Sequence, residues 1–324
     1  MSRKILVTGG AGFIGSHFIT KMLNDGYIVL NFDALTYAAD LNYLRQLEKY
    51  DRYSFVRGDI RSANDLESAL TTFKPNFVVN FAAETHVDNS LIEPKVFFDT
   101  NINGVLNLLE SVKNFVQKEK NHFFKKLVQI STDEVYGTRS INKPATEYSF
   151  IKPSNIYSAS KASGEAFCTS YAKSYNLPIV ITRCCNNYGR RQNCEKLIPK
   201  ALKLMQKGEN FPLYGDGSQS RQWIHVEDHI SAVIKVLFYG EVGEIYNIGD
   251  ENFITNRALI EQLFKFMRED EKTEYRLIED FIRLVDDRVG HDTSYSIDTS
   301  KLKQNLGWEA KIDFNRGLRE LVSE

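Results

Sequence analysis

The start of the chain contains the feature that most restricts its fold. A short apolar, β-branched run at residues 4–8 is followed by glycines at positions 9, 12 and 15, and then by a segment of helical character at residues 16–23. Such glycines allow a tight turn, the close approach of a pyrophosphate, and close packing of a helix on a strand. The pattern therefore predicts the first βαβ unit of a dinucleotide-binding fold, with the pyrophosphate at the helix N-terminus.

A carboxylate follows the second predicted strand, at residues 28–32. Asp33 lies at about the spacing expected for an acid that binds the ribose hydroxyls of NAD. No Lys or Arg occurs between Asp33 and Arg45, so this segment offers no cation to bind the 2′-phosphate of NADP. The pattern favours NAD and does not exclude NADP. A glycine-rich turn without a cofactor is the alternative, which the combination of strand, helix and acid disfavours.

Strand and helix patterns alternate through the first 183 residues, which is typical of a doubly wound parallel sheet in an α/β fold of Rossmann type. Ligands bind at the carboxyl edge of such sheets. We therefore expect the strand ends at residues 58–60 and 81–83 to line the cofactor crevice. The other predicted strands are 53–57, 77–81, 126–131, 179–183 and 245–248, and the predicted helices include 65–73, 102–116, 157–175 and 228–239.

After residue 183 the segments become rich in turns, which predicts a smaller C-terminal domain for the substrate. We assign residues 1–183, with about 222–250, to the NAD-binding domain. Residues of about 184–221 and 251–324 form the predicted nucleotide-sugar-binding domain.

Composition excludes several classes of protein. The net charge of the 324 residues is −1, so no basic face for nucleic acid is expected, and no apolar run is long enough to span a membrane. The first predicted strand begins at Lys4, which leaves no room for a signal peptide. The cysteines lack C-x-x-C spacing, so we expect reduced thiols in a cytoplasmic protein and no metal site. They are Cys168, Cys184, Cys185 and Cys194.

A hydroxyl and two carboxyls, on Thr132, Asp133 and Glu134, follow the strand predicted at 126–131. They are expected at the sheet edge where ligands bind. Because neighbouring carboxyls in a closed site repel each other's charge, one can stay protonated as an acid while the other acts as a base. The alternative is a solvated strand end without chemistry.

Tyr157 and Lys161 are four residues apart and share one face of a predicted helix. A cation beside a phenol lowers the pKa of the phenol, so Tyr157 is a candidate base near neutral pH. Tyr148 and Lys152 have the same spacing, but Pro153 follows them and disfavours a continuous helix there.

These residues together resemble the extended short-chain dehydrogenase/reductase superfamily and, within it, the nucleotide-sugar 4,6-dehydratases of the dTDP-glucose type. The resemblance covers nearly the whole chain. The glycine motif and Tyr-x-x-x-Lys occur throughout the superfamily, whereas Thr-Asp-Glu is more specific, because related epimerases and decarboxylases lack an adjacent acid and base there. The matching segments are 8–15, 82–88, 131–137, 157–161, 186–189, 223–228 and 287–292.

The resemblance implies an enzyme that oxidises a sugar transiently at C4, eliminates water across C5 and C6, and returns the hydride to C6. Tyr157, assisted by Lys161, would remove the proton of the C4 hydroxyl. Glu134 would abstract the C5 proton, and Asp133 would protonate the departing C6 hydroxyl. Thr132 would bind the sugar near O4. The product is a 4-keto-6-deoxy sugar nucleotide.

The resemblance also implies ligand-binding residues and a homodimer. Arg221 and Arg288 would bind the pyrophosphate, because a guanidinium pairs with phosphate oxygens in fork geometry. The implied cofactor-binding residues are Gly9, Gly12, Phe13, Ile14, Gly15, Asp33, Asp59, Ile60, Ala82, Ala83, Thr100, Tyr157 and Lys161. The implied substrate-binding residues are Thr132, Asn187, Lys196, Leu197, Arg221, Asn256, Arg288 and His291.

Two departures from the family pattern concern the substrate. Asn89 stands where the dTDP-glucose enzymes commonly carry arginine, and His-Val-Asp-Asn-Ser looks more like the UDP-glucose 4,6-dehydratases of UDP-rhamnose synthesis. Residues 190–194 replace a loop that usually contains proline and an aromatic residue. These changes favour UDP-glucose or UDP-N-acetylglucosamine over dTDP-glucose, and added 5-epimerisation remains open.

Two other functions stay open. A 4-epimerase or decarboxylase of the same fold would use Tyr157 and Lys161 but would not need Asp133 and Glu134. A non-catalytic NAD-binding interaction protein would tolerate replacement of Tyr157 by Phe without loss of function.

Overall fold

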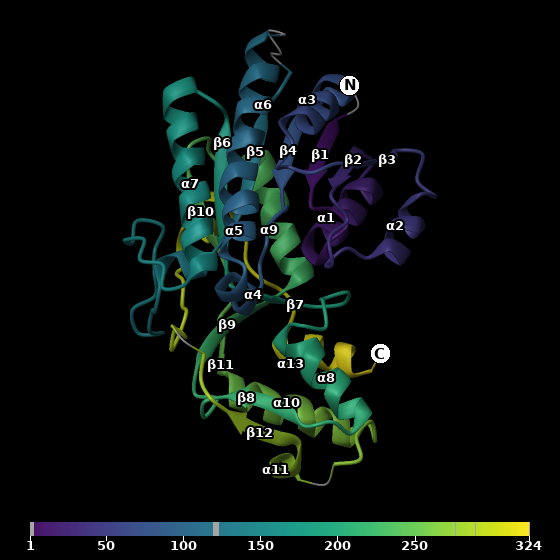
Figure 1. The fold of residues 1–324 in the computed structure, drawn as a ribbon, viewed down its shortest axis with the longest axis vertical. Coiled ribbons are helices and arrows are strands. Elements are labelled where there is room, and N and C mark those ends of the chain that lie inside the picture. The colour runs from purple at the N-terminus through teal and green to yellow at the C-terminus, as the bar shows by residue number, and fades with distance from the viewer. Residues whose placement is uncertain (1–2, 119–122, 276, 289, 324) are drawn as a thin grey trace.

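The computed structural model describes residues 3–118, 123–275, 277–288 and 290–323 (Figure 1). Val289, within one of the matching segments, lies outside the described residues. Within them, a seven-stranded parallel sheet has the order β10-β6-β5-β4-β1-β2-β3, which confirms the predicted doubly wound fold. The strands are β1 (Lys4–Thr8), β2 (Ile28–Asp33), β3 (Tyr53–Arg57), β4 (Phe77–Asn80), β5 (Lys126–Thr132), β6 (Ile179–Cys184) and β10 (Ile245–Ile248). The strand order reverses between β1 and β4, the position where such sheets open a ligand crevice.

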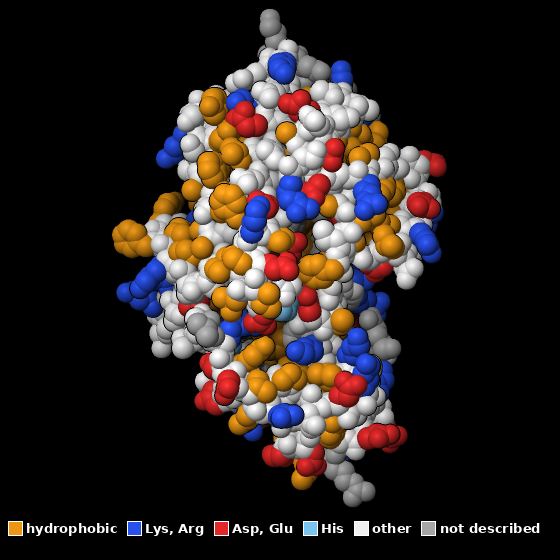
Figure 2. All heavy atoms as spheres, in the orientation of Figure 1, with side chains coloured by type: hydrophobic (Ala, Val, Ile, Leu, Met, Phe, Trp, Pro, Cys, Tyr) orange, Lys and Arg blue, Asp and Glu red, His pale blue; other side chains and the backbone are white. Residues whose placement is uncertain are grey.

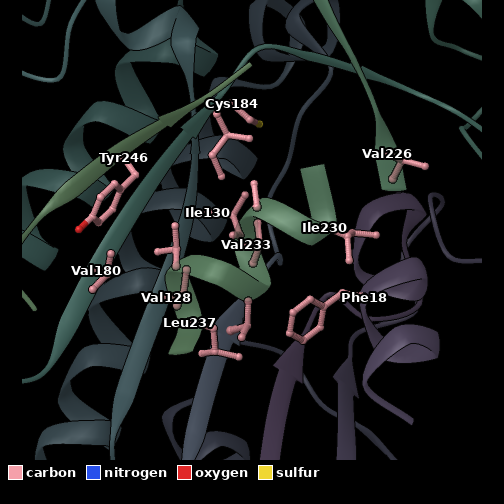
Figure 3. Close-up of a cluster of buried hydrophobic side chains, with 14 of the residues drawn as sticks. Phe18, Val128, Ile130, Val180, Cys184, Val226, Ile230, Val233, Leu237 and Tyr246 are labelled. Carbon is pink, nitrogen blue, oxygen red and sulfur yellow. The ribbon is translucent and has the colours of Figure 1, made fainter. Parts of the chain in front are cut away.

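Helices cover both faces of this sheet because its strands are apolar on both sides. Ile5 and Val7 of β1 belong to the apolar cluster on one face, and Leu6 belongs to the cluster on the other. The first face carries α1 (Phe13–Asn24) and α9 (Val226–Tyr239), and the second carries α3 (Ala63–Phe73), α6 (Val105–Lys118) and α7 (Ile156–Tyr175). Figure 3 shows Val233 and Leu237 of α9 beside Val128 and Ile130 of β5, and Ile230 of α9 on the side of Phe18 of α1.

Local hydrogen bonds set the helix ends. The Asn155 side chain accepts from the backbone N–H of Ser158, and the Ser158 hydroxyl accepts from the backbone N–H of Asn155. These two hydrogen bonds form a capping box at the start of α7. α3 begins two residues before the predicted position because Ser62 caps it by accepting from the backbone of Asp65. The helix predicted at 102–116 instead begins as a π-helical segment, η1 (Asp99–Gly104), that continues into α6.

A smaller lobe lies below the sheet in Figure 1 and has its own apolar core, which includes Trp223, Leu263 and Phe281. Its strands form a three-stranded sheet of β7 (Asn186–Tyr188), β9 (Ser220–His225) and β11 (Asn252–Thr255), and a pair of β8 (Phe211–Tyr214) and β12 (Ile282–Val285). Its helices are α8 (Leu197–Lys207), α10 (Asn256–Glu269), α11 (Ile278–Phe281) and α13 (Phe314–Val322). The remaining elements are α2 (Leu41–Leu47), α4 (Val87–Ile92), α5 (Pro94–Phe98), η2 (Asp133–Tyr136) and α12 (Ser300–Leu306).

The surface offers no strongly charged face in the view of Figure 2, where Lys, Arg, Asp and Glu side chains are interspersed. None of the helices in the described ranges is both long and apolar enough to cross a membrane. The same residues contain no cluster of three or more His, Cys, Asp or Glu side chains suited to a metal ion.

Candidate active site

The glycine loop after β1 forms one wall of a cleft. Gly9 has φ of +70°, and a Cβ added at Gly15 would lie 2.3 Å from the Gly9 carbonyl oxygen, so Gly15 is needed for the loop itself. A Cβ at Gly12 would meet nothing closer than that same oxygen at 3.4 Å. Gly12 lines the cleft, so its missing side chain leaves room for a ligand. This is the geometry that a pyrophosphate at the start of α1 requires.

Asp33 lies at the end of β2, on the cleft, and is held by the backbone. Its Oδ2 accepts from the N–H of Ala11 and its Oδ1 from the N–H of Leu35, both at 2.8 Å. Arg61 is the one cation among the described residues that line the cleft, and it is paired with Asp59 at 2.6 Å. Glu84, also on the cleft, has a pKa raised by burial. An acid-lined wall whose cation is already paired suits NAD better than the 2′-phosphate of NADP.

Most of the predicted cofactor residues line this cleft. Phe13, Ile14 and Gly15 begin α1 behind the wall, and Tyr157 and Lys161 lie buried beyond it. The predicted residues on the cleft are Gly9, Gly12, Asp33, Asp59, Ile60, Ala82, Ala83 and Thr100. The cleft residues that the sequence analysis missed include Thr36, Ala38, Ala39, Arg61 and Glu84.

The Gly12→Ala variant tests the role of the loop. We expect a melting temperature close to that of the parent, because the added methyl has room in the protein, but at least about tenfold weaker NAD binding, because it intrudes on the ligand. Calorimetric titration of NAD into cofactor-free protein measures the effect. Gly15→Ala is the matched control: its methyl meets the backbone, so it should lose both stability and binding. Equal NAD affinity in Gly12→Ala and the parent would refute this assignment.

Asp133 is almost fully buried at the start of η2, directly after β5. Its exposed fraction is 2%, its Oδ1 lies 3.3 Å from the hydroxyl of Thr132, and its Oδ2 has no partner among the described residues. Burial, and then the neighbouring charge of Glu134, raise the pKa of Asp133 to about 8. Asp133 therefore keeps its proton at neutral pH, as a general acid requires.

Glu134 faces the second cleft, between the sheet and the smaller lobe. Its Oε2 accepts from the side-chain amide of Asn155 at 3.2 Å and lies 3.2 Å from the hydroxyl of Tyr295. Burial raises the pKa of Glu134, while Asn155 and the charge of Arg221 oppose the rise. A carboxylate so placed can take a proton from a ligand in the cleft.

Tyr157 and Lys161 share one face of α7, as predicted, but the electrostatic expectation was wrong for this state of the protein. Burial, and then the charge of Glu134, raise the pKa of Tyr157 well above its usual value. The Lys161 ammonium donates to the carbonyl of Ile130 at 2.7 Å, and burial lowers the pKa of Lys161. The spacing of this pair is visible in the sequence, but the buried, acidic surroundings that set the pKa of Tyr157 appear only in the folded chain.

A pH profile tests the role of Asp133. We expect kcat/KM to fall as the pH rises through about 8, because the acid form of Asp133 predominates below its raised pKa and is lost above it. Asp133→Asn should lower turnover strongly and flatten this alkaline limb. The measurement is kcat/KM against pH for both proteins, and an unchanged limb in the variant would assign it to another group.

The second cleft contains six of the eight predicted substrate-binding residues: Lys196, Leu197, Arg221, Asn256, Arg288 and His291. Thr132 is buried beneath Glu134. Asn187 is turned away from the cleft, with its amide donating to the carbonyl of Cys185 at 3.0 Å, and Asn186 lines the cleft in its place. The lining residues that the sequence analysis missed include Thr85, Asp88, Asn155, Glu195, Tyr214, Trp223, Asp292 and Tyr295.

Both arginines of this cleft are held in place. Arg288 forms a two-point pair with Asp88, at 2.6 and 2.9 Å, and its guanidinium lies over the ring of Tyr214. Arg221 lies over the ring of Tyr295 at 4.4 Å and donates to the carbonyl of Asp292. Asn256 Oδ1 and Trp223 Nε1 are buried without a partner among the described residues, as expected of atoms that bind a polar ligand.

The comparisons with known proteins agree with this geometry. The family model described as GDP-mannose 4,6 dehydratase matches residues 6–321. A dTDP-glucose 4,6-dehydratase of Haemophilus influenzae is 42% identical over 98% of this chain and 96% of its own length.

Solved structures of nucleotide-sugar enzymes share this fold. A dTDP-glucose 4,6-dehydratase of Streptomyces venezuelae, solved with NAD bound, has a TM-score of 0.91 and 39% identity, and the match covers 99% of this chain and 96% of that one. The UDP-glucose 4-epimerase of Thermus thermophilus, also with NAD, has a TM-score of 0.87 and 29% identity, over 99% and 98% of the two chains. With its acid pair, its fit to NAD and these relatives, the chain belongs to the NAD-dependent nucleotide-sugar 4,6-dehydratases of the GDP-mannose 4,6-dehydratase family.

Proposed function

We propose that this protein converts dTDP-glucose to its 4-keto-6-deoxy product. The observation that carries the proposal is the buried Asp133, whose pKa is raised to about 8, next to Glu134, which lines the second cleft. The choice of nucleotide is supported by the relatives at about 40% identity, which are dTDP-glucose enzymes. They do not support the UDP preference that Asn89 and residues 190–194 suggested.

The residues of the chain divide the reaction among them. Tyr157 would remove the proton of the C4 hydroxyl as a phenolate, a form that its buried, acidic surroundings disfavour in the protein without cofactor. The Thr132 hydroxyl, which hydrogen-bonds to Tyr157, would orient O4. When bound, NAD would supply the hydride acceptor for C4 and the hydride donor for C6. Lys161, whose ammonium donates to the carbonyl of Ile130, would supply a positive charge on the same face of α7 as the phenol.

The elimination uses the two carboxyls. A ketone at C4 acidifies the proton at C5, and Glu134 is the carboxylate that faces the cleft to take it. Asp133 gives its proton to the C6 hydroxyl, which leaves as water. Asp133 is buried with a pKa raised to about 8, whereas Glu134 is half-buried and lines the cleft, so their surroundings separate the acid and base roles.

The nucleotide would be held by the second cleft. Arg221 and Arg288 would bind the pyrophosphate, and Lys196, Leu197, Asn256 and His291 would surround it. We further propose that residues 1–183, with about 222–250, bind NAD, while about 184–221 and 251–324 bind the nucleotide sugar.

We also propose a homodimer that pairs α5, α6 and α7 with their copies. Figure 2 shows hydrophobic side chains gathered over this side of the molecule. Phe98 at the end of α5 and Tyr175 at the end of α7 are 50% and 44% exposed, and Ile92 of the adjoining α4 is 76% exposed. Large apolar side chains at this exposure suit an interface between copies.

Mass spectrometry tests the function. The purified protein is incubated in heavy water with dTDP-glucose, UDP-glucose and UDP-N-acetylglucosamine separately. We expect loss of one water and gain of one deuterium at C5 with dTDP-glucose. The same product from a UDP-sugar alone would overturn the nucleotide assignment. NMR of the product would reveal any 5-epimerisation.

A 4-epimerase is the second candidate, because the Thermus thermophilus epimerase shares the fold. It predicts an isomer of unchanged mass in the same experiment. The buried acid beside Glu134 has no task in that reaction, which is why we favour dehydration.

A further inference from the structure

Three hydroxyls converge on Asp292, a buried carboxylate in the wall of the second cleft. The Tyr295 hydroxyl donates to its Oδ2 at 2.6 Å, the Thr138 hydroxyl donates to its Oδ1 at 2.6 Å, and the Ser154 hydroxyl also donates to Oδ2. Asp292 is 6% exposed and Tyr295 is 4% exposed, whereas Thr138 and Ser154 are exposed residues. Asp292 thus joins a buried phenol to two hydroxyls at the surface.

The same phenol reaches Glu134. Tyr295 Oη lies 3.2 Å from Glu134 Oε2, farther than its 2.6 Å contact with Asp292. A phenol has one proton to donate, and the shorter distance indicates that Tyr295 donates it to Asp292. The oxygen of Tyr295 therefore presents a lone pair to Glu134, which is the arrangement that accepts a proton from a protonated carboxyl.

We propose that Tyr295 and Asp292 form a proton path between Glu134 and the outer surface. The inference rests on the proposed function, in which Glu134 takes the C5 proton. A nucleotide sugar bound in the second cleft would cover the side of Glu134 that faces the cleft. The other side-chain contact of Glu134 in the described part of the chain is the amide of Asn155, whose N–H is too weakly acidic to pass a proton on. The contact with Tyr295 is therefore the one that suits a proton path.

The transfer balances without a redox step. The O–H bond of protonated Glu134 breaks as a bond forms to Tyr295 Oη, and the phenolic proton of Tyr295 passes to Asp292 Oδ2. Asp292 then releases a proton to water through the hydroxyl of Thr138 or Ser154, which accepts one proton and gives one up. The reverse sequence brings a solvent proton to Glu134. One proton leaves the site for each that enters, and Glu134 can return a solvent proton to C5.

The test is the deuterium content at C5 of the product formed in heavy water. We expect the parent protein to incorporate deuterium at C5. Removing both surface hydroxyls, by Thr138→Val with Ser154→Ala, should lower the deuterium fraction at least twofold, because the proton taken from C5 is then returned before it exchanges. The deuterium fraction of each single variant should lie between those of the parent and the double variant, since one of the two hydroxyls remains.

Further variants keep the inference falsifiable. Asp292→Asn, which breaks the path at its centre, should retain protium at C5 whenever it turns over. Ser140→Ala is the matched control, because it removes an exposed hydroxyl of the same loop that does not contact Asp292. An unchanged deuterium fraction in the double variant, or no deuterium in the parent product, overturns the path. Absence of any dehydrated product from the parent overturns the proposed function and the path with it.

Discussion

Replacing Glu134 by Gln is expected to lower the rate of dehydration by ~10²–10⁴-fold, the usual contribution of a positioned general base. An amide has nearly the shape of the carboxylate but cannot take the C5 proton. Oxidation at C4 depends on Tyr157 and not on Glu134, so reactions quenched early should accumulate a 4-keto sugar that still carries its C6 oxygen. Product formation and the quenched intermediate are both measured by mass spectrometry.

The control for this variant is Glu309→Gln, which removes an exposed carboxylate that pairs with Lys303 at the surface. It should turn over like the parent. Turnover of Glu134→Gln within a few-fold of the parent would refute the dehydratase mechanism. It would favour a 4-epimerase or a decarboxylase instead.

Replacing Arg183 by Met is expected to lower the free energy of unfolding by about 3–5 kcal/mol, because it leaves a buried carboxylate without its partner. Arg183 of β6 binds Glu165 of α7 at 2.6 Å, and their side chains are 4% and 6% exposed. Arg183 also donates to the hydroxyl of Tyr136 at 2.7 Å. The pair therefore fixes the catalytic helix to the sheet just past Lys161.

Denaturant titration of Arg183→Met, Glu165→Met and the double variant measures this effect. The double variant should recover much of the lost stability, since two apolar side chains replace two charges. Equal unfolding midpoints in the parent and Arg183→Met would show that the ion pair does not stabilise the fold.

The sequence predicted the larger sheet well because its strands are short apolar runs buried on both faces, a pattern that needs no tertiary information. The ends of β1, β3 and β10 agree with the prediction, and the other strands end within one residue of it. The start of α6 was missed because π-helical turns have no sequence signature of that kind.

The candidate site was predicted less completely. Asp292 ends the matching segment 287–292 and Tyr295 follows it, but nothing in their spacing shows that Tyr295 reaches Glu134, which is more than 150 positions earlier in the chain. Asn186 and Asn187 are adjacent on β7, and neighbours on a strand point to opposite faces, so only the structure decides which one faces the ligand. The local sequence pattern identifies which residue types are suited to the site. Which side chains face the ligand, and which are buried, is decided only when the chain packs.

The pair between Arg288 and Asp88 joins the smaller lobe to α4, and it has a consequence for turnover. If Arg288 binds the pyrophosphate as proposed, the ligand must displace the carboxylate of Asp88, so its net affinity is the difference between two ion pairs. When product leaves, Asp88 pairs with the guanidinium again, and the arginine keeps a partner in the empty cleft. This competition would lower the affinity for the nucleotide and speed the exchange of one sugar nucleotide for the next.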